Sequence, residues 1–206
     1  MPSRTATCVA SGRAGFIVMT LRASKIVIMR APPGVLAPAH ATMIAFTGAM
    51  ESRMHRPVLR PARAGDVPAM AALVDAAYAR YIPRMGRKPG PMLDDHAARV
   101  AAGQVVVAVD AAGRLLGVLV LLPCEDGALL MDNVAVLPGF EGQGIGRALM
   151  RHAEEEALRR GAPVLRLYTH ETMTENIALY SRAGYAEVAR VEEKGFRRVY
   201  MEKRPR

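Results

Sequence analysis

Three glycines at alternate positions stand where an apolar stretch gives way to a helical pattern. Gly142, Gly144 and Gly146 alternate with Gln143 and Ile145, after the run LLMDNVAV and a short turn, LPGFE. Glycines at the start of a helix leave the backbone N–H groups unobstructed, and the helix dipole adds positive potential at the same place. Such an arrangement binds anions, and a diphosphate suits it well. The sequence therefore predicts a diphosphate-binding turn here.

The spacing of these glycines excludes two common phosphate-binding motifs. A nucleotide P-loop needs Lys-Ser or Lys-Thr after its last glycine, and no glycine in the chain is followed by such a pair. A dinucleotide fingerprint, GxGxxG, needs a third glycine that the chain lacks. Counted from Gly142, that position holds Arg147. Counted from Gly144, it holds Leu149.

A third pattern, Q/R-x-x-G-x-G/A, fits the same stretch. Gly144 and Gly146 fill its glycine positions, and Glu141 stands where Gln or Arg is usual. A shifted register that begins at Gln143 and ends at Ala148 also fits formally. This pattern is the pyrophosphate loop of the GNAT acetyltransferases, which bind acetyl-coenzyme A, so the stretch resembles that loop. A plain strand–turn–helix would use glycines too, and the rest of the chain decides between the two.

Length and composition indicate one ordinary globular domain. The chain has 206 residues, 51% of them hydrophobic and 23% charged, which is enough for a full hydrophobic core. Its two cysteines, Cys8 and Cys124, lie far apart and have no histidine or cysteine at metal-ligand spacing. This pattern favours a reducing compartment and argues against a disulfide scaffold or a metal site. We therefore expect a cytoplasmic protein without a bound metal.

The positive charge is concentrated near the amino terminus. Residues 1–50 hold five basic residues and no acidic one, and without them the net charge of +9 falls to +4. We therefore do not expect a nucleic-acid partner, because a polyanionic cofactor accounts for a mildly basic domain. No apolar patch in this segment approaches the ~20 residues that span a bilayer, so we expect no membrane association either.

Residues 1–54 are predicted to be a basic, disordered extension of a domain that covers residues 55–206. The extension resembles a transit peptide in composition, because its residues 1–50 contain arginine and no acidic residue. A simpler interpretation is that the sequence includes an upstream stretch and that the protein begins at Met50 or Met54.

The domain sequence alternates between strand and helix patterns. We expect helices at about 70–81, 93–102, 145–160 and 175–183, and strands at 56–62, 104–110, 114–122, 128–136, 163–169, 185–191 and 196–203. Residues 82–91 are too rich in Pro and Gly for regular structure. Because the central strands are apolar nearly throughout, helices should cover both faces of the sheet. The helical crossover between the fourth and fifth strands makes those two strands parallel.

This order of elements resembles the GNAT superfamily of N-acetyltransferases over about residues 56–204. NVAVLPGFEGQGIGRALM is similar to the central motif of that superfamily, and LRLYTHETMTENIALYSRAGY to the segment that follows it. Recurring family residues in the second segment match Asn176, Leu179-Tyr180 and Gly184-Tyr185. The resemblance implies an α/β fold, with a mixed sheet of about seven strands, about four flanking helices, and splayed parallel strands four and five.

The resemblance also implies acetyl-CoA as the acetyl donor. The backbone of Val134 and Val136 would pair with the pantetheine amides like an added strand. Asn176 would bond the pantetheine arm, although asparagine near a helix start is also a common cap. The residues that the resemblance assigns to the donor are Val134, Ala135, Val136, Glu141, Gly142, Gln143, Gly144, Ile145, Gly146, Arg147, Asn176 and Tyr180.

Acetyl transfer to an amine needs a base and an acid. Deprotonating a lysine-like amine at pH 7 costs about 4.6 kcal/mol. A base in contact with the amine lowers this free-energy cost by accepting the proton. Asp132 is the only ionisable residue of the fourth strand, and it is either that base or a partner for a loop or helix end. His170 and Glu171 are the second candidates. The resemblance implies that Tyr180 protonates the departing thiolate; the alternative is a core tyrosine.

The predicted function is an acetyl-CoA-dependent N-acetyltransferase that works by direct attack in a ternary complex. Cys124 has no His or Lys beside it in sequence, so no acyl-enzyme is expected. A small-molecule amine is the first choice of acceptor, in a pocket formed by residues 78–92 and the carboxy-terminal hairpin. A protein N-terminus or lysine, and a non-catalytic acyl-CoA-binding regulator, are the alternatives. The sequence is also compatible with a homodimer.

Overall fold

The protein, described by a computed structural model, divides into two compact units, Met1–Arg53 and Met54–Arg206. The structure describes residues 7–10, 16–21, 25–30 and 57–206. In the first unit, three strands form an antiparallel sheet in the order β1-β2-β3. These strands are β1 (Thr7–Ala10), β2 (Phe16–Leu21) and β3 (Lys25–Arg30).

The three strands of the first unit lie within residues 1–54, the range that composition predicts to be a disordered extension. Runs of β-branched residues, such as Ile26-Val27-Ile28, favour paired strands over disorder. The other residues of this range lie outside the described part of the chain, and so do both alternative start positions, Met50 and Met54. The assignment of residues 1–54 as an extension stays a prediction.

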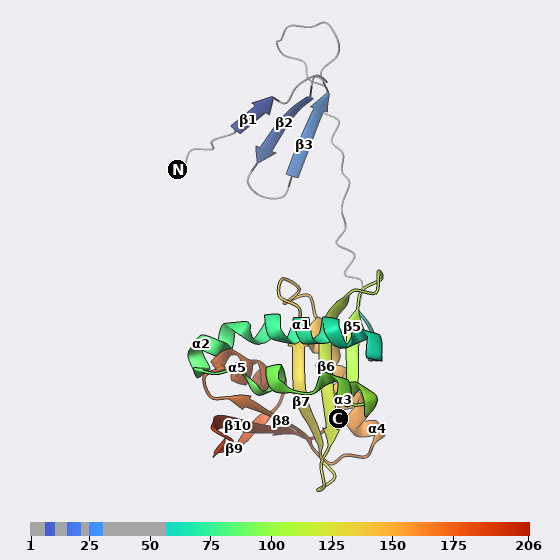
Figure 1. Cartoon of the computed structure of the whole chain (residues 1–206), viewed down its shortest axis with the longest axis vertical. Helices are drawn as coiled ribbons and strands as arrows, with labels where there is room; N and C mark the ends of the chain where they lie inside the picture. The colour runs from blue at the N-terminus through green and yellow to red at the C-terminus, as the bar shows by residue number, and fades with distance from the viewer. Residues whose placement is uncertain (1–6, 11–15, 22–24, 31–56) are drawn as a thin grey trace, which may run out of the picture. The chain divides into compact units, whose positions relative to one another are not determined.

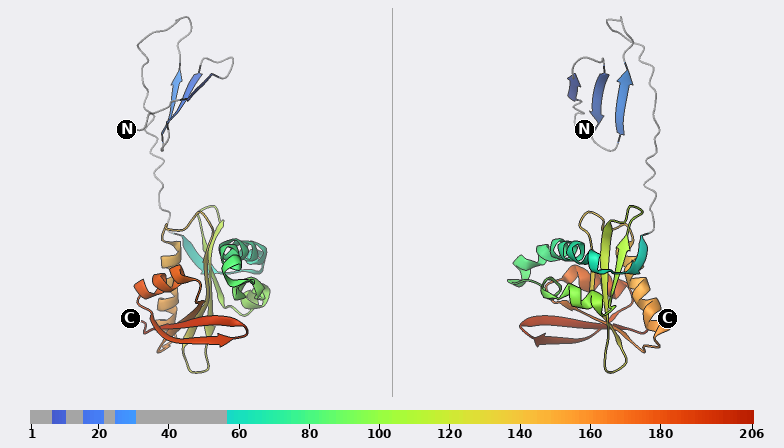
Figure 2. Two further views of the ribbon diagram at one scale, coloured as in Figure 1. Left: turned by 90° about the vertical axis from the view of Figure 1, so that its left-hand side faces the viewer. Right: turned by 45° about the vertical axis from the view of Figure 1, so that its right-hand side comes forward.

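The second unit is a mixed seven-stranded sheet with helices on both faces (Figures 1 and 2). The strand order is β4-β5-β6-β7-β8-β10-β9, and only β7 and β8 are parallel. The strands are β4 (Val58–Pro61), β5 (Val105–Val109), β6 (Leu115–Pro123), β7 (Leu129–Val136), β8 (Leu165–His170), β9 (Ala186–Glu193) and β10 (Phe196–Lys203). The helices are α1 (Val67–Tyr78), α2 (Ile82–Met85), α3 (His96–Ala101), α4 (Ile145–Arg159) and α5 (Thr174–Arg182). The predicted α/β fold and its parallel strand pair are thus confirmed.

The central strands are buried on both faces because each face carries its own layer of helices. Figure 2 shows α1 and α3 on one side of the sheet, and α4 and α5 on the other. Along β6, Val118 and Val120 pack in the cluster that contains α1 residues. Leu119 and Leu121 pack in the opposite cluster, with Leu149 of α4. This alternation explains why β6 is apolar at nearly every position. Within the described residues, no helix is both long enough and apolar enough to cross a bilayer.

The connection between α1 and α3 is more regular than its sequence predicts. It contains the short helix α2 and a 3-10 turn, η3 (Gly90–Leu93). Pro83 fits the first turn of α2, where its missing N–H costs no hydrogen bond, and Gly86 ends that helix with a left-handed φ of 68°. The following helix begins at His96 and not at Leu93, because the Asp95 side chain caps it by accepting from the N–H of Ala98 at 2.9 Å.

Gly117 in β6 lies where α4 crosses the sheet. A Cβ atom at this position would lie 2.9 Å from Cδ1 of Leu149 and 3.0 Å from Cγ2 of Ile145. Real Cβ atoms rarely have such close neighbours, so the glycine permits the first turns of α4 to approach the sheet closely. Because the predicted diphosphate turn precedes α4, this contact also fixes where that turn lies.

We expect Gly117→Ala to lower the free energy of unfolding by about 1–3 kcal/mol, because the methyl group overpacks the contact with α4. Urea denaturation measures the change. Gly65→Ala is the matched control: no neighbouring atom lies within 4 Å of its Cβ position and its φ is not positive, so its effect should stay within about 0.5 kcal/mol. Equal stability of the two variants would contradict the assigned contact.

Candidate active site

The parallel pairing of β7 and β8 ends part of the way along both strands. The paired residues run from Leu129 opposite Leu165 to Met131 opposite Leu167. Beyond this point β7 continues to Val136 and β8 to His170, but the two strands no longer pair with each other. The predicted splay between the fourth and fifth strands of the domain is therefore present, and it opens a gap in the sheet.

A β-bulge in β7 lies at the point where the gap begins. On the β6 side, Val120 pairs with Asn133. The next residue of β6, Leu121, pairs with Met131, so Asp132 is an extra residue in the ladder. A bulge bends its strand and increases the local twist. It also places neighbouring side chains on one face, and here Asp132 bonds Tyr168 while Asn133 accepts a hydrogen bond from Tyr78 at 2.9 Å.

The backbone of β7 beyond the bulge faces the gap at alternate residues. The N–H of Leu137 donates to the carbonyl of Leu116 at 2.9 Å, toward β6. Since alternate strand residues direct their backbone groups to the same side, Val134 and Val136 direct theirs away from β6. Both are predicted donor-binding residues, and both offer amide groups to a ligand in the gap. Ala135, the third predicted residue, directs its backbone to β6 and packs in the α1 cluster.

The glycine turn before α4 has the geometry of an anion site. Gly142 and Gly144 have left-handed φ values of 77° and 84°, and no atom lies within 4 Å of either Cβ position, so backbone conformation and not space requires glycine. Ala148 donates to the carbonyl of Gly144 at 2.9 Å, which is the first bond of the helix. The N–H groups of Ile145, Gly146 and Arg147 consequently have no acceptor within α4.

The two polar side chains of the turn fold back onto its backbone. Glu141 accepts a hydrogen bond from the N–H of Gly139 at 2.6 Å, and Gln143 donates to the Gly139 carbonyl at 3.4 Å. Hydrogen bonds from the backbone N–H groups of Glu141 and Gly139 lower the pKa of the Glu141 carboxyl group. Glu141 therefore stays ionised, and any anion held by this turn must be bound mainly by backbone N–H groups.

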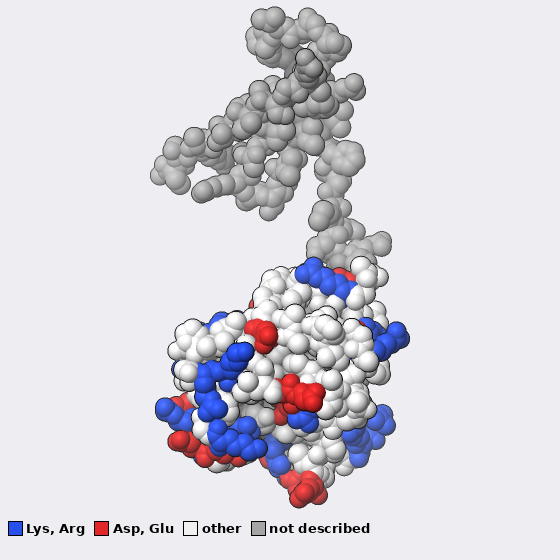
Figure 3. All heavy atoms as spheres, viewed as in Figure 1, with Lys and Arg blue, Asp and Glu red and all other residues white. Residues whose placement is uncertain are grey.

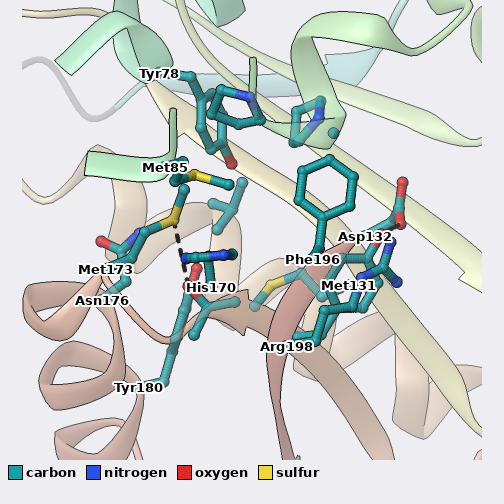
Figure 4. Close-up of a pocket in the computed structure, with 16 residues that line it drawn as sticks. Tyr78, Met85, Met131, Asp132, His170, Met173, Asn176, Tyr180, Phe196 and Arg198 are labelled. Atoms are coloured by element: carbon teal, nitrogen blue, oxygen red, sulfur yellow. Dashed lines mark hydrogen bonds between the residues drawn. The ribbon is translucent and has the colours of Figure 1, made fainter. Parts of the chain in front are cut away.

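The gap opens into a pocket that brings the predicted catalytic residues together (Figure 4). Asp132 and Val134 line it from β7, and Asn176 and Tyr180 line it from α5. Residues of the α2–η3 connection and of β10 complete the wall, in agreement with the segments predicted for an acceptor pocket. These are Met85, Pro89, Gly90, Pro91, Phe196 and Arg198.

Tyr180 and Asn176 lie one turn apart on α5. Tyr180 is 8% exposed, and burial raises the pKa of its phenol, with Tyr81 contributing further. The phenol therefore keeps its proton at neutral pH. Asn176 accepts a hydrogen bond from the Tyr81 hydroxyl at 3.3 Å. Tyr81, which lies between α1 and α2, therefore orients the Asn176 side chain. Both residues line the pocket, and their roles stay predictions.

Asp132 is held by a residue that the sequence alone did not single out. The Tyr168 hydroxyl donates a hydrogen bond to the Asp132 carboxylate, and burial, followed by the Asp132 charge, raises the pKa of Tyr168. Arg198 of β10 lies over the Tyr168 ring, with 4.0 Å between its Cζ atom and the ring centroid. Neither stands out in the sequence, since Tyr168 lies between Leu167 and Thr169, and Arg198 lies between Arg197 and Val199.

The second pair of candidate bases is less available than Asp132. Glu171 forms an ion pair with Arg197 at 2.6 Å. His170 lines the pocket, but its Nδ1 accepts a hydrogen bond from the N–H of Thr172 at 3.3 Å. The same Nδ1 lies 2.9 Å from Oγ1 of Thr172, and while it accepts from the Thr172 N–H, the neutral ring carries its proton on Nε2. His170 is therefore suited to donate a hydrogen bond and not to remove a proton.

Comparison with known proteins identifies a family. Residues 70–185, more than half of the chain, match the model of the acetyltransferase (GNAT) family. A streptothricin acetyltransferase from Streptomyces lavendulae is 39% identical over 87 residues, which are 42% of this chain and 46% of the relative. A [ribosomal protein bS18]-alanine N-acetyltransferase from Escherichia coli is 40% identical over 55 residues, 27% of this chain and 37% of the relative. The chain thus spans less than half the length of these relatives.

Solved structures share the fold. A PaiA N-acetyltransferase from Thermoplasma acidophilum in complex with coenzyme A has a TM-score of 0.60, with 71% of this chain and 98% of that chain covered. Because the two sequences are 16% identical, this likeness concerns the fold alone.

Burial lowers the pKa of His170 below its usual value of 6.5, which predicts a pH effect on stability. The folded protein binds this proton less tightly than the unfolded chain, so acidification below about pH 6.5 should destabilise the fold. We expect wild type to lose more unfolding free energy between pH 8 and pH 5 than His170→Gln does, as measured by urea denaturation at both pH values. Equal losses in the two proteins would show that burial does not affect this ring.

Proposed function

The chain belongs to the GNAT family of acetyltransferases, and on that basis we propose that it transfers an acetyl group from acetyl-CoA to a primary amine of a small molecule. The observation that carries the proposal is the gap between β7 and β8. It leaves the backbone of Val134 and Val136 unpaired with β8, and Val134 lines one pocket with Asp132, Asn176 and Tyr180. The reaction is a direct attack by the amine while both substrates are bound.

The donor is held mainly by backbone groups. The N–H groups of the turn from Glu141 to Arg147 bind its diphosphate, aided by the dipole of α4. Val134 and Val136 pair with the pantetheine amides as an added strand would. Asn176 bonds the same arm from α5. Binding of the diphosphate by backbone groups agrees with the geometry of the turn. The side chains of Glu141 and Gln143 bond to the backbone of Gly139, so the N–H groups at the start of α4 remain for the ligand.

The acceptor amine reacts with the donor's thioester carbonyl between Asp132 and Tyr180. Asp132 takes the amine's proton, directly or through a water, because its carboxylate lines the pocket and is oriented by Tyr168. Tyr180 returns a proton to the departing thiolate. Its buried phenol keeps its proton at neutral pH, and the same poorly solvated pocket raises the proton affinity of the thiolate that forms next to it.

A bridge across the pocket mouth favours a small acceptor over a polypeptide. Arg87, from the α2–η3 connection, lies over the Phe196 ring, with 4.1 Å between its Cζ atom and the centroid. It also donates to the carbonyls of Lys194 and Gly195 at 3.4 and 3.3 Å. A polypeptide lying between these two segments would have to break those contacts. The relative named for streptothricin supports the same class of acceptor, whereas the one named for ribosomal protein bS18 supports a protein N-terminus.

The proposal is tested by a screen of primary amines and amino-terminal peptides with the full chain, which follows the release of free CoA thiol. We expect small amines to be acetylated faster than peptides. Binding of acetyl-CoA without turnover of any amine or peptide would identify a non-catalytic binding protein. Absence of acetyl-CoA binding would contradict the proposal altogether.

Tyr180→Phe should lower kcat by about 10- to 100-fold and change KM for acetyl-CoA little, because the variant loses a proton donor used only as the thiolate leaves. Tyr185→Phe is the matched control: its ring contacts that of Tyr180 at a centroid distance of 6.0 Å, but it does not line the pocket. Steady-state kinetics of both variants decide the assignment. A Tyr180→Phe enzyme with wild-type kcat would refute it.

Gly144→Ala should weaken acetyl-CoA binding at least tenfold, because strain at a left-handed φ distorts the anion site. Gly161, just after α4, has a left-handed φ of 67°, so Gly161→Ala should cost similar stability without weakening binding. Calorimetric titration with acetyl-CoA, together with urea denaturation, separates the two effects. Equal losses of affinity in both variants would mean that the turn is not the diphosphate site.

A further inference from the structure

The floor of the pocket carries an arginine that the proposed chemistry does not use. In the β8–β10 ladder, Arg198 is opposite His170 and Tyr200 is opposite Tyr168. Paired residues project to the same face of a sheet, so these four side chains share the face that lines the pocket. The Arg198 side chain is only 17% exposed. An arginine this buried calls for a partner or a ligand.

Arg198 and Asp132 both contact the side chain of Tyr168. The guanidinium of Arg198 stacks on the Tyr168 ring at 4.0 Å, and the hydroxyl of the same ring bonds the Asp132 carboxylate. Figure 4 shows Asp132 and Arg198 on one side of the pocket, beside Phe196, with Asn176 and Tyr180 on the other. A cationic group and an anionic group therefore both contact Tyr168 and line the same pocket.

One nitrogen of Arg198 is already engaged, and this contact orients the group. Nη1 of Arg198 lies 2.8 Å from Glu193, and Glu193 in turn accepts a hydrogen bond from Tyr200 at 2.5 Å. A guanidinium has five N–H donors in a planar fork, so donors beyond this contact can serve a ligand. Planar, two-pronged anions such as carboxylates match that fork best.

The pocket mouth adds positive charge around this arginine. Figure 3 shows a band of Lys and Arg along the side of the domain formed by α2 and the β9–β10 hairpin. The basic residues of these segments include Arg84, Arg87, Lys88, Lys194 and Arg197. Part of this charge is offset by Glu175, which pairs with Arg84, and by Glu171, which pairs with Arg197. The hairpin itself also carries Glu187, Glu192 and Glu193. The remaining positive potential attracts an acceptor with an anionic group and disfavours a polycation.

We propose that the acceptor is an amine that also carries a carboxylate, as an amino acid does. Arg198 binds the carboxylate, and Asp132 faces the amine. The inference rests on the proposed acetyl transfer and specifies its substrate class. In the reaction the amine nitrogen forms a bond to the acetyl carbon as the carbon–sulfur bond breaks. One proton passes from nitrogen to Asp132, and another from Tyr180 to sulfur, so the products are an N-acetyl amino acid and free CoA.

The first test compares acceptors that differ only at the carboxylate. The full chain is assayed with the common amino acids, and the best one is compared with its amide and with its decarboxylated amine. We expect kcat/KM to fall at least 50-fold for both analogues. Equal rates for all three would overturn the inference while leaving the proposed acetyl transfer intact. Failure of every amine to release CoA thiol would instead contradict the proposed function itself.

The second test changes the arginine. Arg198→Met should raise KM for the amino acid at least tenfold and leave KM for its amide unchanged, because only the acid loses a partner. Arg190→Met is the matched control, since Arg190 lies on β9, pairs with Glu187 and is 57% exposed; its kinetics should equal those of wild type. If Arg198→Met fails to fold by circular dichroism, Arg198→Lys should show a smaller loss with the same selectivity for the acid. Equal effects on acid and amide would overturn the assignment of Arg198.

Discussion

The bulge at Asp132 is the constraint on which the site depends. An extra residue in β7 ends the alignment with β8 directly after Met131. It also changes which residues direct their backbone toward β8, so Val134 and Val136 present N–H and C=O groups to an open gap. Without the bulge, the two parallel strands could pair along their length, and the pocket would be filled by the sheet itself.

The same irregularity places the polar side chains. Asp132 and Asn133 are neighbours in sequence, yet both bond tyrosines that line the pocket, Tyr168 and Tyr78. In a regular strand, one of the two would point into the cluster under α4. The bulge thus allows both polar side chains to lie on the pocket face, while Met131 packs in the cluster under α4.

The position of α4 completes the arrangement. Gly117 allows the helix to lie close to β6, and Gly144 allows the chain to turn sharply into it. The turn of residues 137–144 joins the end of β7 to the start of α4, and a Cβ atom at Gly146 would lie 3.5 Å from Cγ2 of Val136. The first turn of α4 therefore lies close to the end of β7. Backbone geometry, more than side-chain identity, builds the donor site that we propose, which is why an unusual residue such as Glu141 is tolerated there.

Local patterns in the sequence predict the fold well and the site in part. The glycine turn, the parallel crossover and Asp132 are visible because each depends on neighbours in sequence, and Tyr180 is visible through the family resemblance of its segment. Tyr168 and Arg198 are not, because the β8–β10 ladder brings them to Asp132. The bulge is hidden as well, since LLMDNVAV fits a continuous strand. The helical turn α2 was missed because tertiary contacts such as Arg84–Glu175, at 2.8 Å, help to hold it in place.

Hydrogen exchange at the amides of β7 tests the central claim most directly. In the free protein, the amides of Val134 and Val136 should exchange faster than that of Ala135, which faces β6. Saturating acetyl-CoA should slow exchange at Val134 or Val136 at least tenfold and leave Ala135 nearly unchanged. Strong protection of all three amides without ligand would mean that β7 and β8 are paired throughout, and it would contradict the account.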